Sequence, residues 1–313
     1  MSEAASGAEP ELSVVLAPVA RGVHLPDALA CLAAQESAPS FEIIVPVDDS
    51  ISGIGPLREK YPAVRFISVE GTAEQGRSED FGIAHLAIDR RRAAALAAAT
   101  APIVAITDEW ARPRADWCRE LVRAHADPHA VIGGAIGCAR DRPVNWALFF
   151  MDGGRYQNPL PEGPAVFVTD VNVSYKRAAL ESTDVWREEY HETRLHDELR
   201  ARGESLWLTP RLVVDVDRGE ITLGDALRER FAWSRLYAGR RSQEVSGGMR
   251  LALAAGSPLL SLVLLFRQVR IAWERGAHRD ALLRCVPVLA LMDLVWSVGE
   301  ATGYLTGRGT STH

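Results

Sequence analysis

The stretch Phe41-Glu-Ile-Ile-Val-Pro-Val-Asp-Asp-Ser50 joins an apolar run to two acidic residues. Such a run is typical of a strand that is buried on both faces of a sheet. A similar run, Leu12-Ser-Val-Val-Leu-Ala17, precedes it, and the residues between them have a helical pattern around Leu25 to Gln35. Strand, helix and strand in this order predict a parallel pair and therefore an α/β sheet.

Two further apolar runs extend the predicted sheet. Val64–Val69 predicts a third strand, and Ile103–Ile106 predicts another after an alanine-rich helix over Arg90–Thr100. That strand delivers Thr107-Asp108-Glu109-Trp110 at its carboxyl end. Because open parallel sheets bind ligands at the carboxyl ends of their strands, the acids after both strands are expected at one site. An ordinary turn is the alternative for Asp48-Asp49-Ser50, since Asp and Ser are common turn formers.

The middle of the chain is predicted to be rich in loops. This segment begins at Gly133-Gly134 and is rich in Pro and Gly between Pro143 and Pro164. Long loops in compact domains are often lids over a substrate pocket, and a disordered surface segment is the alternative. A strand that enters a turn is expected over Asp170–Arg177.

A carboxylate opens the next predicted helix. The pattern runs from His191-Glu192 to Gly203, with Leu195 and Leu199 as anchors on one face. A carboxylate in this position can be held rigidly beside a cleft. Taken alone, an acid in a first helical turn is more often a surface charge that compensates the helix dipole.

The chain changes character after about residue 225. A basic helical stretch, Arg228–Arg241, is followed by sixteen residues without a charge, Leu251–Phe266, and later by Cys285–Gly299 with Asp293 as its single charge. A spanning helix needs about 20 apolar residues, so we expect interfacial or re-entrant helices. Flanking arginines suit an anionic cytoplasmic leaflet. A helical hairpin packed on the rest of the protein or in a dimer interface is the alternative.

The composition narrows the function classes. Hydrophobic residues make up 47% and charged residues 24% of 313 residues, as in an ordinary globular protein. The net charge of -6 argues against general nucleic-acid binding, because such proteins present a basic surface to phosphates. The polar, acidic start shows no signal-peptide pattern. Four cysteines without metal-ligand spacing favour a reduced, cytosolic setting: Cys31, Cys118, Cys138 and Cys285.

In this order, the motifs resemble those of family-2 glycosyltransferases of the inverting GT-A type over nearly the whole chain. Ser13–Pro18 is similar to the opening strand that ends in proline, and Glu42–Ser50 to the nucleotide-binding acidic turn. Arg92–Trp110 resembles the segment that leads into the metal motif, and Asn172–Arg177 resembles the acceptor-side strand. The C-terminal Gly299–Gly307 resembles the tail of a membrane-associated bacterial subgroup.

The resemblance implies a fold and its boundaries. We expect a GT-A nucleotide-diphospho-sugar transferase fold, which is Rossmann-like with a mostly parallel sheet and flanking helices, plus C-terminal apolar helices. Residues 1–10 would be a flexible tail, residues 11–225 the catalytic domain, and residues 226–313 a membrane-associated helical region. The protein would act at the cytoplasmic face of a membrane, in bacterial cell-surface glycan biosynthesis.

The resemblance also implies roles for individual residues. Glu192 stands at the second position of the family's Glu-Asp pair and would be the general base. Asn172 and His191 would lie on the acceptor side, and Asp108 with Glu109 would hold a divalent cation, Mn or Mg. The residues expected to bind the nucleotide-sugar donor are Pro18, Asp48, Asp49, Arg92 and Asp108.

The chain departs from the family pattern at several positions. Trp110 replaces an expected metal ligand at the third position of the Asp-x-Asp motif, and His191 replaces the first acid of the Glu-Asp pair. Val47 and Asp49 stand where aspartate and glycine are more common, which leaves Asp48 as the best match. Adjacent strand residues point to opposite faces, so one of the two acids before Trp110 would contact a cation directly.

The expected activity is transfer of a sugar from a nucleoside-diphosphate sugar to a hydroxyl acceptor, with inversion. The acceptor would be a glycan, a lipid-linked molecule or a small molecule. The protein would also bind a membrane surface, and it would not bind nucleic acid. Because of Trp110, the alternative is a catalytically weak or inactive homologue that binds a nucleotide sugar or a partner enzyme at a membrane. A dehydrogenase fits less well, since no Gly-x-Gly-x-x-Gly turn follows the first strand.

Overall fold

The computed structural model describes residues 9–78 and 81–307, so most of the predicted tail and residues 308–313 lie outside the described part. The chain forms two compact units. The first contains residues 9–77, 86–136 and 160–216. The second contains residues 78, 81–85, 137–159 and 217–307. The second unit therefore includes segments that precede residue 225, and the predicted domain boundary there stays a prediction.

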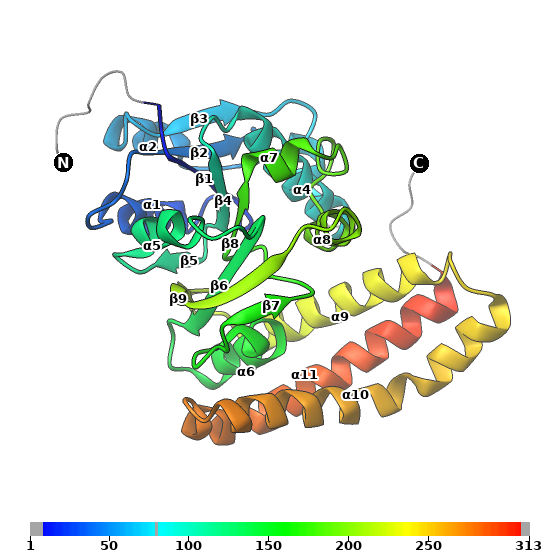
Figure 1. The fold of residues 1–313 in the computed structure, drawn as a ribbon. Coiled ribbons are helices and arrows are strands. Elements are labelled where there is room, and N and C mark those ends of the chain that lie inside the picture. Colours follow the sequence, from blue (N-terminus) through cyan, green and yellow to red (C-terminus); the bar gives the residue numbers. More distant parts are fainter. Residues whose placement is uncertain (1–8, 79–80, 308–313) are drawn as a thin grey trace. The chain divides into compact units, whose positions relative to one another are not determined.

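A parallel sheet forms one half of the first unit (Figure 1). Its strands are β1 (Leu12–Ala17), β2 (Phe41–Val47), β3 (Arg65–Ser68) and β4 (Ile103–Asp108), in the order β3-β2-β1-β4. Leu12 lies opposite Phe41 on one side and opposite Ile103 on the other. The predicted parallel pair is confirmed, with bounds for β1 and β2 equal to those expected.

The other strands continue the sheet beyond β4. The order is β8-β6-β9-β5, and β7 also pairs with β9. β8 pairs antiparallel with β4 and β6, and β9 pairs antiparallel with β5 and β7. The strands are β5 (Ala111–Pro113), β6 (Val131–Cys138), β7 (Gly163–Ala165), β8 (Val173–Lys176) and β9 (Leu206–Val216). The predicted α/β class is confirmed: a Rossmann-like parallel half with flanking helices, extended by antiparallel strands and followed by apolar C-terminal helices.

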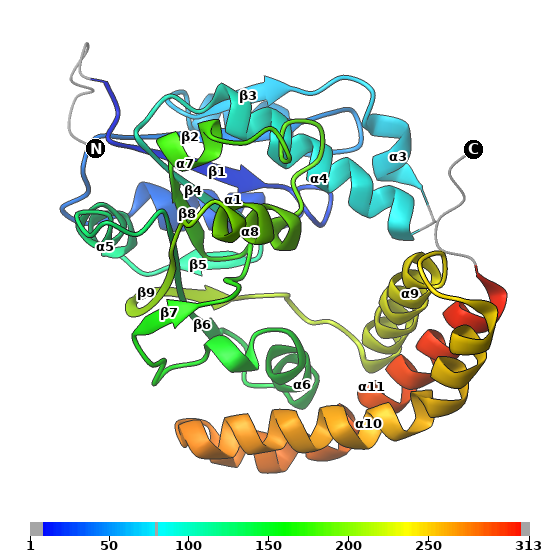
Figure 2. The same cartoon turned by 45° about the vertical axis from the view of Figure 1, so that its right-hand side comes forward.

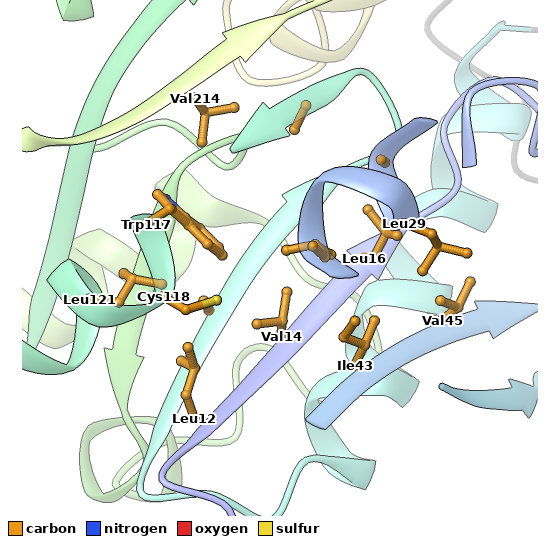
Figure 3. Close-up of a cluster of buried hydrophobic side chains, with 14 of the residues drawn as sticks. Leu12, Val14, Leu16, Leu29, Ile43, Val45, Trp117, Cys118, Leu121 and Val214 are labelled. Atoms are coloured by element: carbon orange, nitrogen blue, oxygen red, sulfur yellow. The ribbon is translucent and has the colours of Figure 1, made fainter. Parts of the chain in front are cut away.

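Helices cover the sheet. They are α1 (Leu25–Ala33), α2 (Ile54–Lys60), α3 (Ala73–Arg77), α4 (Phe81–Ala98), α5 (Trp117–Ala124), α7 (Arg177–Glu181) and α8 (Glu192–Ala201). Successive β1 side chains point to opposite faces, so both faces need a core. Leu12, Val14 and Leu16 share a buried cluster with Leu29 of α1 and Trp117 of α5 (Figure 3).

The opposite face of the sheet has its own core. Val15 and Ile106 are buried there together with Tyr175 of β8. Leu195 and Leu199 of α8 belong to the same cluster and are fully buried. The predicted anchoring of this helix by its two leucines is confirmed.

The prediction of loops from Gly133-Gly134 onward is wrong for most of that segment. Both glycines lie in β6, and α6 (Pro143–Asp152) and the short 3₁₀ helix η1 (Gly154–Tyr156) follow. A Cβ on Gly133 would lie 2.6 Å from Val168, and one on Gly134 would lie 2.3 Å from Asn172 Nδ2. Glycine is therefore present because neighbours approach the strand closely, not because the chain turns.

The second unit is built around three long helices. They are α9 (Leu223–Arg241), α10 (Gly247–Arg275) and α11 (Arg279–Thr306). α11 packs against α9, α10 and α6 (Figure 2). The predicted basic stretch lies in α9. By length and composition, α10 and α11 could each cross a membrane, with 29 and 28 residues. The charge-free runs are only parts of these helices, so the inference that they are too short to span does not hold.

Candidate active site

The first part of the site, which we call the Asp48 cluster, consists of Pro18, Asp48, Ser50, Thr72 and Arg91. Pro18, the pair Asp48 and Ser50, and Thr72 follow the carboxyl ends of β1, β2 and β3, and Arg91 reaches the cluster from α4. Arg91 Nη1 lies 3.1 Å from Asp48 Oδ2, and Arg91 Nη2 donates to the Pro18 carbonyl at 3.4 Å. The Ser50 amide donates to Asp48 Oδ1 at 2.8 Å, and the Thr72 hydroxyl donates to Oδ2 at 2.5 Å.

The Asp48 cluster is a closed, charged pair. Both side chains are almost fully buried, with 4% of Arg91 and 2% of Asp48 exposed. Burial alone would raise the pKa of Asp48, but the hydrogen bonds from Ser50 and Thr72 and the charge of Arg91 lower it below its ordinary value. A Cβ on Gly76 would lie 2.4 Å from Ser50 Oγ, so glycine is required there. Asp48 therefore stabilises a turn, which was the alternative interpretation of Asp48-Asp49-Ser50, and it also pairs with the buried Arg91.

The second part, the Arg92 cluster, consists of Asp89, Arg92, Asp108, Asp170 and Glu192. Arg92 Nη1 lies 2.8 Å from Asp170 Oδ2 and 3.9 Å from Asp89 Oδ1. Asp108 ends β4, and its Oδ1 accepts the amide hydrogen of Trp110 at 2.9 Å. Four carboxylates therefore share one buried arginine.

Burial and the shortage of positive charge raise the pKa values of two acids in the Arg92 cluster, Asp108 and Glu192. Burial raises the pKa of Asp108 to about 7, with Arg92 opposing the shift and Asp170 adding to it. Removal from water also raises the pKa of Glu192, Asp170 raises it further, and Arg92 opposes. The same two charged residues thus act on Asp108 and on Glu192, which places the predicted phosphate-side acid and the predicted base in one electrostatic environment.

Local structure holds Glu192 in place. It is the first residue of α8, where a negative charge is favoured by the helix dipole. The helix ends before Gly203, which has a φ of +87° and donates its amide to the Arg200 carbonyl. With the two buried leucines, this fixes both ends of the short helix.

A buried network of tyrosine hydroxyl groups and a histidine lies next to Arg92. The Arg92 guanidinium lies 5.9 Å from the centre of the Tyr190 ring. The Tyr190 hydroxyl is 2.7 Å from that of Tyr175, which is 2.9 Å from His196 Nε2. Burial lowers the pKa of His196 to about 4, so this histidine is neutral near pH 7 and serves as a hydrogen-bonding partner.

Glu109 does not face the other acids. Its Oε1 accepts the amide hydrogens of Val19, Ala20 and Gly22, and its Oε2 accepts that of His24. The side chain is fully buried. It organises the loop after β1, and this geometry gives no support to the predicted metal role of Glu109. The expectation that adjacent acids point to opposite faces agrees with this arrangement.

The role of Glu109 in the loop can be measured. Glu109→Gln puts an amide group where a carboxylate oxygen accepted a hydrogen bond, so we expect the free energy of unfolding in urea to fall by about 2–3 kcal/mol. Glu59→Gln on the exposed face of α2 is the matched control, with little change expected. Unchanged stability together with weakened Mn²⁺ binding in Glu109→Gln would instead restore its metal role.

Other predicted site residues lie in different surroundings. Asn172 is fully buried: its Oδ1 accepts from Trp117 Nε1, and its Nδ2 donates to the carbonyls of Ala135 and Leu212. Its side chain is thus committed to the core, which gives no support to an acceptor-side role. Asp49 is exposed, and its carbonyl accepts from Arg77.

His191 and Arg92 lie at the site, but in specific pairings. His191 Nδ1 lies 3.3 Å from Asp89 Oδ2, and its Nε2 lies 3.6 Å from Glu189 Oε2. The Nη1 of Arg92 lies between Asp170 and Asp89, and only 3% of the side chain is exposed. Arg92 therefore balances the cluster from within.

The donor set fits a cation that is only partly held by protein. Within residues 9–78 and 81–307, no three His, Cys, Asp or Glu residues come together as a metal site. Mg²⁺ and Mn²⁺ prefer hard oxygen ligands and often take only one or two carboxylates, with phosphates and water completing the shell. Asp108 offers a buried carboxylate in a region with excess negative charge. It is the residue that would hold such a cation beside a diphosphate.

Four members of the site were not predicted from the sequence: Thr72, Asp89, Arg91 and Asp170. Arg91 adjoins Arg92 in a run of three arginines, and only the side chain's direction distinguishes them. Asp170 was included in a predicted strand without a role, although it lies before β8. Asp89 carried no signal. A charged run within an alanine-rich helix was the one available sign of a buried ionic site.

Comparison with known proteins gives little for this chain. No known protein family and no curated protein matches the sequence. Among solved structures, a mannosyltransferase from Pyrobaculum calidifontis in complex with GDP-Man and Mn²⁺ is similar with a TM-score of 0.43 and 17% sequence identity. The match covers 96% of this chain and 75% of the other. At this score and identity, the similarity transfers no function.

Proposed function

We propose that the protein transfers a sugar from a nucleoside-diphosphate sugar to a hydroxyl acceptor, with inversion at the anomeric carbon. The observation that supports this most is the shared environment of Asp108 and Glu192: both have a raised pKa, and Arg92 and Asp170 act on both. A diphosphate-side carboxylate and a candidate base at one site are what an inverting transfer needs.

The proposed step uses Glu192 as the general base. Its carboxylate takes the proton of the acceptor hydroxyl, the acceptor oxygen forms a bond to the anomeric carbon, and the bond from that carbon to the diphosphate oxygen breaks. A divalent cation at Asp108 would supply charge stabilisation for the leaving diphosphate. Arg92 acts as a positioning residue, since its ion pair with Asp170 offsets the repulsion among the carboxylates of the cluster.

The nucleotide end of the donor is assigned to the Asp48 cluster. Asp48 and the Pro18 carbonyl lie at the carboxyl ends of β2 and β1, where open α/β sheets bind ligands. Both oxygens of Asp48 already accept hydrogen bonds within the protein. Asp48 therefore shapes the turn and holds Arg91, and a nucleotide would contact the exposed side of this turn, next to Asp49.

Titration of donor binding tests this function. We expect a nucleoside diphosphate to bind with Mn²⁺ present, measured by isothermal titration calorimetry, and to bind more weakly to Asp108→Asn. Binding that needs neither Mn²⁺ nor Asp108 would contradict the proposed diphosphate site. Tight binding without any transfer would favour the alternative, a catalytically weak nucleotide-sugar-binding protein, which Trp110 after the two acids still motivates.

The raised pKa of Glu192 predicts the pH dependence of transfer. Glu192 must be ionised to accept a proton, so kcat is expected to fall as the pH falls through its raised pKa, which lies above the ordinary 4.5. Asp170→Asn removes a negative charge that raises this pKa, so the acidic limb should move to lower pH. The check is the pH profile of kcat for both proteins, and an unmoved limb would contradict the assignment.

We also propose that the second unit associates with a membrane. In the charge-poor window of α10 only 11% is buried within the structure, and large apolar side chains are exposed along it. They include Leu259, Leu262, Val263 and Phe266, which are 60–69% exposed. Such a face is costly in water and favourable in a bilayer. The cytoplasmic side and a role in glycan biosynthesis remain predictions from the sequence.

Polar substitutions test the apolar face. Leu262→Gln with Phe266→Gln should reduce partitioning onto vesicles at least about tenfold, since each buried side chain contributes on the order of 2 kcal/mol. The matched control is Val166→Gln. Val166 lies in the loop between β7 and β8, and it is also exposed, at 54%, but it belongs to the first unit. Flotation with vesicles gives the measurement. Equal partitioning of the double variant and the wild type would count against α10 as the contact surface.

A further inference from the structure

The second unit contains a cavity that the proposed transfer does not use. It has a volume of ≈ 130 Å³ and lies where α6 and η1 meet α10. A single water needs only about 10–15 Å³ by such a measure, so the cavity has room for a larger group. Its lining residues are Phe150, Met151, Asp152, Gly154, Arg155, Arg267, Gln268 and Ile271.

The charge of this cavity favours an anion. Arg155 and Arg267 line it, and within the described residues neither forms an ion pair with a carboxylate. The one acidic lining residue, Asp152, is already balanced, because Arg230 Nη1 lies 2.5 Å from its Oδ1. Arg267 is partly balanced by the charge of the buried Asp293 carboxyl, and Arg155 has no carboxylate partner among the described residues. Guanidinium groups bind phosphate well through paired N–H donors.

A buried polar atom points to the same place. Gln268 is 7% exposed, and its Nε2 donates to Asp293 Oδ1 at 3.2 Å. Among residues 9–78 and 81–307, no group donates a hydrogen bond to its Oε1. A buried acceptor without a partner is costly, so a donor from outside the chain is expected there. The hydroxyl group of a polar headgroup would supply one.

The cavity adjoins the exposed apolar face. Arg267 follows Phe266 directly, and Leu262 and Val263 lie one turn before them on α10. Phe266 is 69% exposed and Val263 is 60% exposed. A phosphate bound by the two arginines would thus be next to a surface suited to hydrocarbon chains. A free phosphate ion would make no use of that surface.

We propose that this cavity binds the phosphate headgroup of an anionic phospholipid, with its acyl chains along the exposed face of α10. Arg155 and Arg267 hold the phosphate, and Gln268 accepts a hydrogen bond from a headgroup hydroxyl. The site rests on the proposed membrane association of this unit, and it is independent of the transfer reaction.

Vesicle binding by the full chain tests the cavity. The probes are phosphatidylglycerol vesicles and neutral phosphatidylcholine vesicles, and the variant is Arg155→Ala with Arg267→Ala. Its matched control is Arg270→Ala with Arg284→Ala, which removes two positive charges from the surface ion pairs with Glu274 and Asp141. We expect the cavity variant to lose about tenfold or more in affinity for phosphatidylglycerol, and the control less than about threefold.

The remaining outcomes separate the possibilities. Equal losses in both double variants would show general surface attraction and overturn the cavity site. The proposed lipid site would be overturned if millimolar inorganic phosphate displaced the protein from phosphatidylglycerol vesicles while Leu262→Gln with Phe266→Gln left vesicle binding unchanged. That result would show that the cavity binds a free anion. Failure of the wild type to bind any vesicle would overturn the membrane association itself. Thermal unfolding checks the fold of each variant, and the single change Arg267→Glu serves as a second variant.

Discussion

Replacing Glu192 with glutamine is expected to lower kcat for sugar transfer by roughly 10²- to 10⁴-fold, the usual contribution of a general base. Glutamine has nearly the same shape but cannot accept the acceptor's proton. Because Glu192 acts on the acceptor and not on the nucleotide, the Kd for the donor should stay within about twofold. Initial rates of nucleoside-diphosphate release, together with calorimetric donor binding, measure the two quantities.

A control on the same helix isolates the effect of the base. Glu198 also lies on α8, but its carboxylate pairs with Arg202 at the surface. Glu198→Gln is expected to keep kcat within about twofold, because exposed ion pairs contribute little. A similar loss in both variants would mean that α8 was disturbed as a whole, and a Glu192→Gln enzyme with full turnover would remove the assigned base.

Replacing Arg92 with methionine is expected to lower the free energy of unfolding by about 3–5 kcal/mol. Arg92 is 3% exposed, and it is the charge that balances Asp170 and Asp89. Its removal leaves carboxylates in a region that already raises the pKa of Asp108 to about 7. Breaking one side of a buried ionic group is costly for this reason, whereas the methionine side chain refills most of the space.

The pH dependence of this loss identifies its cause. The carboxylates left without Arg92 can be neutralised by protons at low pH, so the destabilisation measured by urea unfolding should be smaller at pH 5 than at pH 8. Arg90→Met is the matched control, since Arg90 is 39% exposed and pairs with Glu189. It should cost less than about 1 kcal/mol at both pH values. A pH-independent loss in Arg92→Met would point to packing and not to charge.

The parallel half of the fold could be predicted because its strands are short apolar runs with clear ends. β1 and β2 have the predicted bounds, since both are buried on two faces and end at a proline or an acidic turn. β6 could not be recognised, because Gly133 and Gly134 are required by close neighbours that only the folded chain brings together. Local sequence carries no sign of such contacts.

The site was predictable in position and not in pairing. Asp48 and Asp108 follow strands, and Glu192 starts a helix, so spacing alone located them. The direction of each side chain depends on partners distant in sequence. Glu109 accepts hydrogen bonds from the amides of the loop after β1, whereas its neighbour Asp108 belongs to the Arg92 cluster.

The C-terminal helices show the limit of counting uncharged residues. Arg267 ends the apolar run in the sequence, but α10 continues through Arg267 and Arg270 to Arg275. Long arginine side chains can extend to a polar surface while the helix remains regular. Helix length was therefore underestimated from charge alone.

The most direct test of the proposed function is release of nucleoside diphosphate from a panel of nucleotide sugars, with Mn²⁺ and candidate hydroxyl acceptors, by wild type and Glu192→Gln side by side. We expect acceptor-dependent release from at least one donor by the wild type, with an inverted anomeric product. We also expect Glu192→Gln to lose most turnover with donor binding intact. Donor binding with equal release by both proteins, or a product that retains its configuration, would contradict the proposed function.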